Sequence, residues 1–167
     1  LLMSSCSNPT TLTRTYRPGD EKKINKAFNE IFGENRQLDE WRWKFQPEND
    51  LARILLLVEK NSGKILGQYA GIIVPFQIDG KKMLALQSVD DFCVRRGDLT
   101  HRKAYTRLAA EYRQKVISEG LIGFGFGFPS KRVAKLISYA GETETVLDIP
   151  EYTRTPSWPL PRLTQWK

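Results

Sequence analysis

The feature that most constrains the fold is a change of pattern near residue 95. Before it, short turn signals alone separate three apolar segments, which span 52–59, 65–78 and 83–94. Connections this short join antiparallel strands, so the segments predict a meander. After it, apolar residues recur at helical spacing over about 102–118, and a short strand follows at 121–128. A meander continued by a strand–helix–strand unit predicts an α/β fold with one mixed, mostly antiparallel sheet and helices on both faces.

Further elements are predicted on either side of this central run. Weak alternation predicts a first strand within 12–17, and helical spacing predicts helices from the N-cap Asp20 to Gly33 and over 38–45. Beyond the central run we expect a helix from about Ser130 to Gly141 and a last strand over 144–152. The expected order is therefore β-α-α-β-β-β-α-β-α-β.

The strand at 121–128 has an unusual composition. Gly123, Gly125 and Gly127 occupy one face, and three phenylalanines occupy the other. A face lined by glycine leaves room for a ligand to approach the backbone. We therefore expect this strand to splay from the fourth strand, near Phe92-Cys93-Val94, and leave a cleft.

Length and composition suit one globular domain. The chain has 167 residues, of which 40% are hydrophobic and 27% charged, and no apolar run approaches the roughly 18 residues of a membrane span. Cys6, Cys93 and the single His101 offer neither a disulfide framework nor a metal-ligand set, and a reducing cytoplasm is the expected compartment. We expect a polar leader over 1–10, the domain over 11–154, and over 155–167 a proline-rich tail that looks like the start of a linker or second domain.

The net charge of +7 is concentrated between Arg95 and Lys135. This stretch holds ten basic and three acidic side chains, so it accounts for the whole excess. Such a concentration indicates a polyanionic partner, either a nucleic acid or a phosphate-bearing ligand. Nucleic acid is disfavoured because Tyr105 and Tyr112 fall on the apolar face of the predicted helix and not between its charges.

Several segments, in this order, resemble the GNAT superfamily of acyl-CoA N-acyltransferases, and in particular a branch of uncharacterised bacterial acetyltransferases. They cover about Thr13 to Arg154 and are L-D-E-W-R-W-K-F at 38–45, I-L-G-Q-Y-A at 65–70, D-F-C-V at 91–94, R-K-A-Y-T-R-L at 102–108, G-F-P-S at 127–130 and D-I-P-E-Y-T-R at 148–154. The resemblance implies transfer of an acetyl group from acetyl-CoA to a small amine or amine-bearing acceptor, and it allows a homodimer.

The resemblance also implies where coenzyme A binds. In this superfamily backbone N–H groups at the start of the central helix bind the pyrophosphate. Here that position falls at Thr100 to Ala104. The implied cofactor-binding residues are Phe92, Cys93, Val94, His101, Arg102, Lys103, Ala104, Tyr105, Ser130, Lys131 and Arg132.

Amine acylation requires a neutral amine, which a general base helps to provide. Bases in this superfamily commonly lie on the fourth strand, an even number of residues before the valine that enters the loop, here Val94. That parity selects Asp90 and Ser88 and places Asp91 on the opposite face. By the same resemblance Trp41 and Trp43 lie near the acceptor entrance, and core packing is the alternative for this pair.

Two features keep a second function open. The loop at 101–104 reads His-Arg-Lys-Ala where the superfamily has glycines, and Ile137 stands where a tyrosine often protonates the leaving thiolate. The alternative is therefore a degenerate, non-catalytic domain that binds acyl-CoA or serves as an interaction module.

Overall fold

A computed structural model describes residues 11–94 and 99–129 of the chain. The chain divides into two units, residues 1–128 and 129–167, and every element named below belongs to the first. The described elements, in chain order, are β1 (Thr11–Thr15), α1 (Glu21–Phe32), α2 (Leu38–Phe45), the 3₁₀ turn η1 (Pro47–Asn49), β2 (Ala52–Glu59), β3 (Ile65–Ile78), β4 (Lys81–Ser88), β5 (Phe92–Cys93), α3 (Leu99–Glu119) and β6 (Ile122–Phe126).

The predicted meander is confirmed. The sheet has the order β1-β2-β3-β4-β6, all neighbours are antiparallel except the parallel pair β4 and β6, and β5 pairs with β3. Asp79 and Gly80 join β3 to β4 with φ of 49° and 78°, which is the left-handed backbone that a two-residue hairpin requires.

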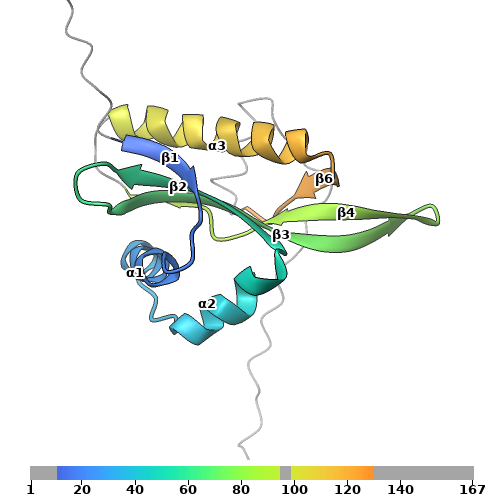
Figure 1. Ribbon diagram of the computed structural model, residues 1–167, viewed down its shortest axis with the longest axis horizontal. Helices are drawn as coiled ribbons and strands as arrows, with labels where there is room; N and C mark the ends of the chain where they lie inside the picture. The colour runs from blue at the N-terminus through green and yellow to red at the C-terminus, as the bar shows by residue number, and fades with distance from the viewer. Residues whose placement is uncertain (1–10, 95–98, 130–167) are drawn as a thin grey trace, which may run out of the picture. The chain divides into compact units, whose positions relative to one another are not determined.

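Helices cover both faces of this sheet, as predicted. Figure 1 shows α3 on one face and α1 with α2 on the other. Each face has its own hydrophobic core. One cluster joins Ile24 of α1 and Trp41 of α2 to one set of strand residues, and the other joins Leu108 of α3 to the alternate set. Because neighbouring residues of a strand point to opposite faces, nearly continuous apolar strands such as β2 are needed to supply both clusters.

Asp20 is the N-cap residue of helix α1, as predicted, but its side chain makes no cap hydrogen bond. Its carboxylate instead accepts two hydrogen bonds from Arg14, at 2.5 and 2.8 Å, and one from the Arg17 backbone at 2.9 Å. Asp20 therefore ties β1 to the start of α1. The predicted end of the helix is confirmed, since Gly33 closes it with φ of 70°.

The fourth predicted strand, 83–94, is not continuous. It is divided into β4 and β5 by Val89, Asp90 and Asp91, and Asp90 has φ of 53°. The ladder between β4 and β6 ends at Gln87 and Phe126, whereas Phe92 and Cys93 pair with β3 at Gln68 and Gly67. Among the described residues no strand pairs with the other edge of β5. The predicted splay between the two strands is therefore confirmed in the pattern of strand pairing.

The glycine-lined face of β6 has a packing role at both ends. A Cβ on Gly123 would lie 3.2 Å from the Met83 sulfur, and one on Gly127 would lie 3.3 Å from the Ser88 Cβ. These distances are tighter than ordinary van der Waals contact, so the two glycines let the chain pass close to β4. The opposite face carries a ladder of phenylalanine rings, in which Phe76 of β3 meets Phe124 edge-on at 5.0 Å. The predicted helix from Ser130 to Gly141 and strand over 144–152 lie outside the described residues.

Candidate functional site at the end of β4

The break between β4 and β5 reverses the expected arrangement of three polar residues. The prediction that Ser88 and Asp90 share a face is wrong. The Ser88 hydroxyl donates a hydrogen bond to the Asp91 carboxylate, whereas Asp90 contacts Arg36 and Lys44 from the layer of α1 and α2. The parity argument assumed an unbroken strand, and the positive φ of Asp90 interrupts it.

Asp91 lies on the α3 face in a largely apolar setting. One carboxylate oxygen accepts the Ala70 backbone N–H at 2.8 Å, and the other accepts the Ser88 hydroxyl. Desolvation outweighs these two hydrogen bonds and raises the pKa of Asp91 to about 7. A carboxyl group with that pKa is half ionised at neutral pH and can take up a proton there.

Tyr105 and Tyr112 lie near Asp91 on this face and pack with Tyr69. The rings of Tyr69 and Tyr105 are 6.3 Å apart, and those of Tyr69 and Tyr112 are 4.8 Å apart. Burial, and then the nearby Asp91 carboxylate, raises the pKa of both Tyr105 and Tyr112. These tyrosines therefore stay protonated at neutral pH, and the Tyr112 hydroxyl donates to the Arg53 carbonyl at 3.1 Å.

Asp90 is held by two cations on the other face. Arg36 donates to one oxygen at 2.5 Å and Lys44 to the other at 2.6 Å, and the Asp90 side chain is only 10% exposed. Its backbone carbonyl also accepts a hydrogen bond from Gln68 at 3.0 Å. With both oxygens engaged by cations, Asp90 is poorly placed to accept a proton from an amine, and its predicted role as the base stays a prediction.

The raised pKa of Asp91 gives a testable dependence of stability on pH. The unfolded chain releases this proton near the ordinary pKa of 3.8 and the folded chain near 7. Between these values the folded state binds more protons, so the contribution of Asp91 to stability is present below about pH 4 and is lost as the pH rises to about 7. Asp91→Asn removes the titration. Relative to wild type, its free energy of unfolding should rise by up to about 4 kcal/mol over this range. Urea unfolding followed by circular dichroism would measure it, and a difference that does not change with pH would contradict the burial of this carboxylate.

Three predicted cofactor residues, Phe92, Cys93 and Val94, lie on β5 or directly after it. Phe92 is 3% exposed and its side chain is part of the core beneath α1, so only its backbone can meet a ligand. The Val94 N–H is already bonded to the Leu66 carbonyl at 2.7 Å. Cys93 is partly buried, and burial raises the pKa of its thiol, which disfavours a reactive thiolate.

Helix α3 starts earlier than predicted. It begins at Leu99, so Thr100 to Ala104 form its first turns and not a loop before it. Only five residues, 94–98, separate the end of β5 from the first residue of α3. Lys103 is exposed, whereas Tyr105 is partly buried and packs against Tyr69, which places its ring toward the sheet. The side chains of His101, Arg102 and Ala104, and residues Ser130, Lys131 and Arg132, lie outside what the structure describes.

The structure separates the two tryptophans. Trp41 is completely buried and packs on Phe45 at 4.9 Å, whereas Trp43 is 77% exposed. Trp43 lines a pocket of about 620 Å³ between α1, α2 and the Asp90 break. Of the pair, only Trp43 is therefore available to a ligand.

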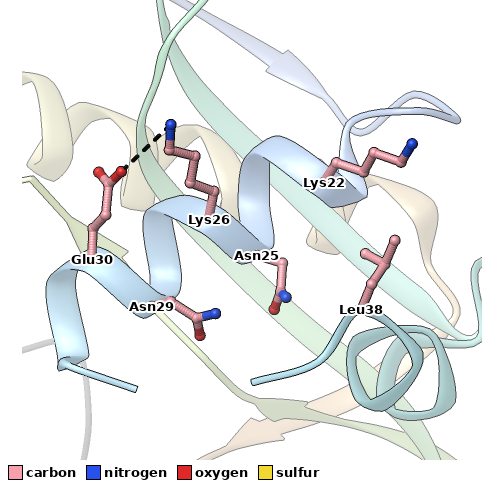
Figure 2. Close-up of a pocket in the computed structure, with 6 residues that line it drawn as sticks. All are labelled: Lys22, Asn25, Lys26, Asn29, Glu30 and Leu38. Carbon is pink, nitrogen blue, oxygen red and sulfur yellow. Dashed lines mark ion pairs between the residues drawn. The ribbon is translucent and has the colours of Figure 1, made fainter. Parts of the chain in front are cut away.

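A second pocket, of about 480 Å³, lies along α1. Figure 2 shows Lys26 and Glu30 of α1 forming an ion pair, at 3.9 Å, while Asn25 and Asn29 project on the side of Leu38. Asn25 and Asn29 are committed to the loop between the helices, because both donate to the Arg36 carbonyl, at 2.7 and 3.0 Å. The asparagine side chains that line this pocket therefore serve to hold the Arg36 loop.

Sequence reasoning missed Arg36 and Lys44 as site residues. Both are common surface residue types, and Arg36 is separated from Asp90 by 54 positions, so no local pattern links them. In the described part of the chain, no group of three or more His, Cys, Asp or Glu side chains is arranged to hold a metal ion. Within the same residues, no helix is sufficiently long and apolar to cross a membrane.

Comparison with known proteins links this architecture to one fold. No protein-family profile and no curated protein matches the sequence. Solved structures do match. Glucosamine-6-phosphate N-acetyltransferase from Arabidopsis thaliana aligns with a TM-score of 0.64 at 14% identity, over 87% of this chain and 99% of that chain. A GNAT family acetyltransferase from Staphylococcus aureus aligns with a TM-score of 0.55 at 14% identity, over 87% and 98%.

A structure with a bound ligand also matches. The aminoglycoside N-acetyltransferase AAC(6')-Iy in complex with CoA aligns with a TM-score of 0.61 at 12% identity, over 86% of this chain and 94% of that chain. Identities this low show the fold alone. By this structural similarity over most of its length, the chain has the GNAT acetyltransferase fold.

Proposed function

We propose that the chain is an N-acetyltransferase that transfers an acetyl group from acetyl-CoA to an amine. The observation that carries this proposal is the edge of β5 that no described strand pairs with, shortly before α3 begins in the chain. The free edge offers backbone donors and acceptors to an amide-bearing arm such as pantetheine, and the N-terminus of a 21-residue helix favours a phosphate group.

The basic residues near α3 support the same ligand. Arg102 and Lys103 lie in the first turns of α3, and Lys131 and Arg132 follow β6 in sequence. Cations at these positions complement a nucleotide that carries several phosphates. This assignment explains the concentrated charge without nucleic acid.

We place Asp91 as the general base of this reaction, with Ser88 orienting its carboxylate. Acetyl transfer forms the amide C–N bond, breaks the thioester C–S bond and releases one proton from the amine. Asp91, directly or through a water molecule, accepts that proton, and the thiolate leaves as coenzyme A and is protonated. Only the ionised carboxylate can accept this proton. The reaction rate should therefore rise as Asp91 ionises near pH 7.

Binding of acetyl-CoA tests the proposal. We expect calorimetry to show binding at low salt and a loss of affinity as salt is added, because cations meet phosphates. Arg102→Ala should weaken binding by about 1–3 kcal/mol if it makes a charge-assisted phosphate contact. Lys60→Ala, an exposed lysine in the turn after β2, serves as the matched control and should bind like wild type. Absence of heat with acetyl-CoA at low salt would contradict the proposal.

The absence of glycines at 101–104 favours the second candidate, a non-catalytic acyl-CoA-binding or interaction module. The two functions differ in one result. The module binds acetyl-CoA but releases no thiol with any amine of a broad panel, whereas the enzyme releases thiol in step with the acetylated amine.

A further inference from the structure

Hydrogen bonds and an aromatic ring hold both the backbone and the guanidinium of Arg36. Its backbone N–H donates to Asn29 at 3.0 Å, and its Nε donates to Asn25 at 2.6 Å. Its Nη1 donates to Asp90 at 2.5 Å, and its Cζ lies 3.7 Å from the centre of the Phe28 ring. Asn25, Phe28 and Asp90 therefore fix the guanidinium in one position, and Asn29 fixes the Arg36 backbone.

One nitrogen of this guanidinium, Nη2, forms no hydrogen bond with the described residues. It is buried, and the Arg36 side chain is only 10% exposed. Each N–H of an arginine is a strong donor, and a buried charged donor without an acceptor is costly. The chain therefore holds a charged donor in place without satisfying it.

The pocket that Arg36 lines suggests what the acceptor of this hydrogen bond is. Its walls are the aromatic rings of Phe28, Phe32 and Trp43, and Lys44 supplies a second cation. Phe32 and Trp43 are 49% and 77% exposed, so an apolar group that covers them would be removed from water. Because Nη2 is buried, a ligand that bonds to it must displace a neighbouring side chain.

Acidic residues complete the charge pattern of the pocket. Glu34 and Glu40 line it and are exposed, whereas Asp90 lies deep between Arg36 and Lys44. Arg36 and Lys44 share one carboxylate, so positive charge is in excess inside the pocket, whereas the rim is negative. This pattern favours a ligand that carries both signs.

We propose that this pocket binds an amine that bears a carboxylate or phosphate-type anion and an apolar body, with the anion on Arg36 Nη2 and Lys44 and the apolar body on Phe32 and Trp43. Asp90 lines this pocket and follows β4 in the chain, so a ligand bound there lies beside the break at the end of that strand. The assignment of this ligand as the acetyl acceptor rests on the proposed acetyl transfer, whereas its binding to the pocket does not.

A series of probes that differ only in the anion tests the pocket by itself. Calorimetry would compare L-phenylalanine, 1-amino-2-phenylethylphosphonate and 2-phenylethylamine with the full chain. We expect either anionic probe to bind at least about tenfold more tightly than 2-phenylethylamine, because a charge-assisted hydrogen bond is gained. The tighter of the two anionic probes identifies the preferred anion. Equal affinity across the series, or no binding by any member, would overturn the proposal.

Two variants locate the binding. Arg36 also ties the loop to α1, so its removal threatens folding, and Lys44→Ala is the better change. It should weaken L-phenylalanine binding about tenfold and leave 2-phenylethylamine unaffected. Lys22→Ala removes a lysine from the neighbouring pocket and serves as the control, with no change expected. If Lys22→Ala weakens binding as much as Lys44→Ala, the anion does not bind at Arg36.

The two proposals fail in different ways. If acetyl-CoA binds and is turned over with some amine but the anionic probes gain no affinity, the pocket assignment is wrong and the proposed function stands. If the anionic probes bind as expected but acetyl-CoA does not, the pocket is a ligand site and acetyl transfer is wrong.

Discussion

Asp91→Asn is expected to lower turnover by roughly 10²–10⁴-fold at neutral pH. The asparagine keeps the shape of the side chain and an oxygen that can accept the Ala70 N–H, and the Ser88 hydroxyl can turn to accept from its amide. It cannot accept a proton. Affinity for acetyl-CoA should therefore stay nearly unchanged while kcat falls.

The pH profile distinguishes this role from a structural one. In wild type kcat should rise with pH through about 7, where Asp91 ionises. In Asp91→Asn that rise should disappear, and activity should recover partly at higher pH, where more of the amine arrives neutral. A merely misfolded variant would not recover.

Two further carboxylates provide the controls. Asp79→Asn, in the turn between β3 and β4, should behave like wild type, because Asp79 is exposed and asparagine also tolerates its φ of 49°. Asp90→Asn tests the prediction made from strand parity. If Asp90→Asn loses the pH-dependent rise and Asp91→Asn keeps full activity, Asp90 is the base and the account of Asp91 is wrong.

Trp41→Ala should destabilise the fold by about 3–5 kcal/mol, because a fully buried indole would leave a large cavity beneath the sheet. Its neighbours Tyr16 and Phe45 lie 5.7 and 4.9 Å away, ring centre to ring centre, and cannot fill that volume without moving α2 or β1. Trp43→Ala, two residues away, should change stability by less than about 0.5 kcal/mol.

Urea unfolding followed by far-ultraviolet circular dichroism would measure both variants without relying on tryptophan fluorescence. The pair is matched in residue type, helix and size of truncation, so the difference reports burial alone. Equal losses for the two variants would mean that α2 does not pack with Trp41 toward the sheet.

The elements that sequence predicted well are those set by local pattern. Strand β2 and helix α2 were predicted at the observed bounds because β-branched and leucine-rich runs, or helical spacing, are visible within a single segment. The hairpin at Asp79-Gly80 was predictable because few residues adopt its backbone. The GNAT order followed once these elements were placed.

The candidate site was harder to predict because tertiary contacts determine it. Nothing near Asp90 in sequence indicates its positive φ, which depends on partners 46 and 54 residues away, and that single residue reverses which acid lies on which face. The side-chain partner of the N-cap Asp20 could not be predicted for a similar reason, since Arg14 of β1 binds its carboxylate. Pairs of charges brought together by folding leave no local signal.

The most direct test of the central claim is a crystal structure of the chain with coenzyme A. We expect density for the pantetheine arm along the free edge of β5, between Phe92-Cys93 and Phe126, and for the pyrophosphate at the start of α3 near Leu99. Coenzyme A bound elsewhere, or absent at saturating concentration, would contradict the account.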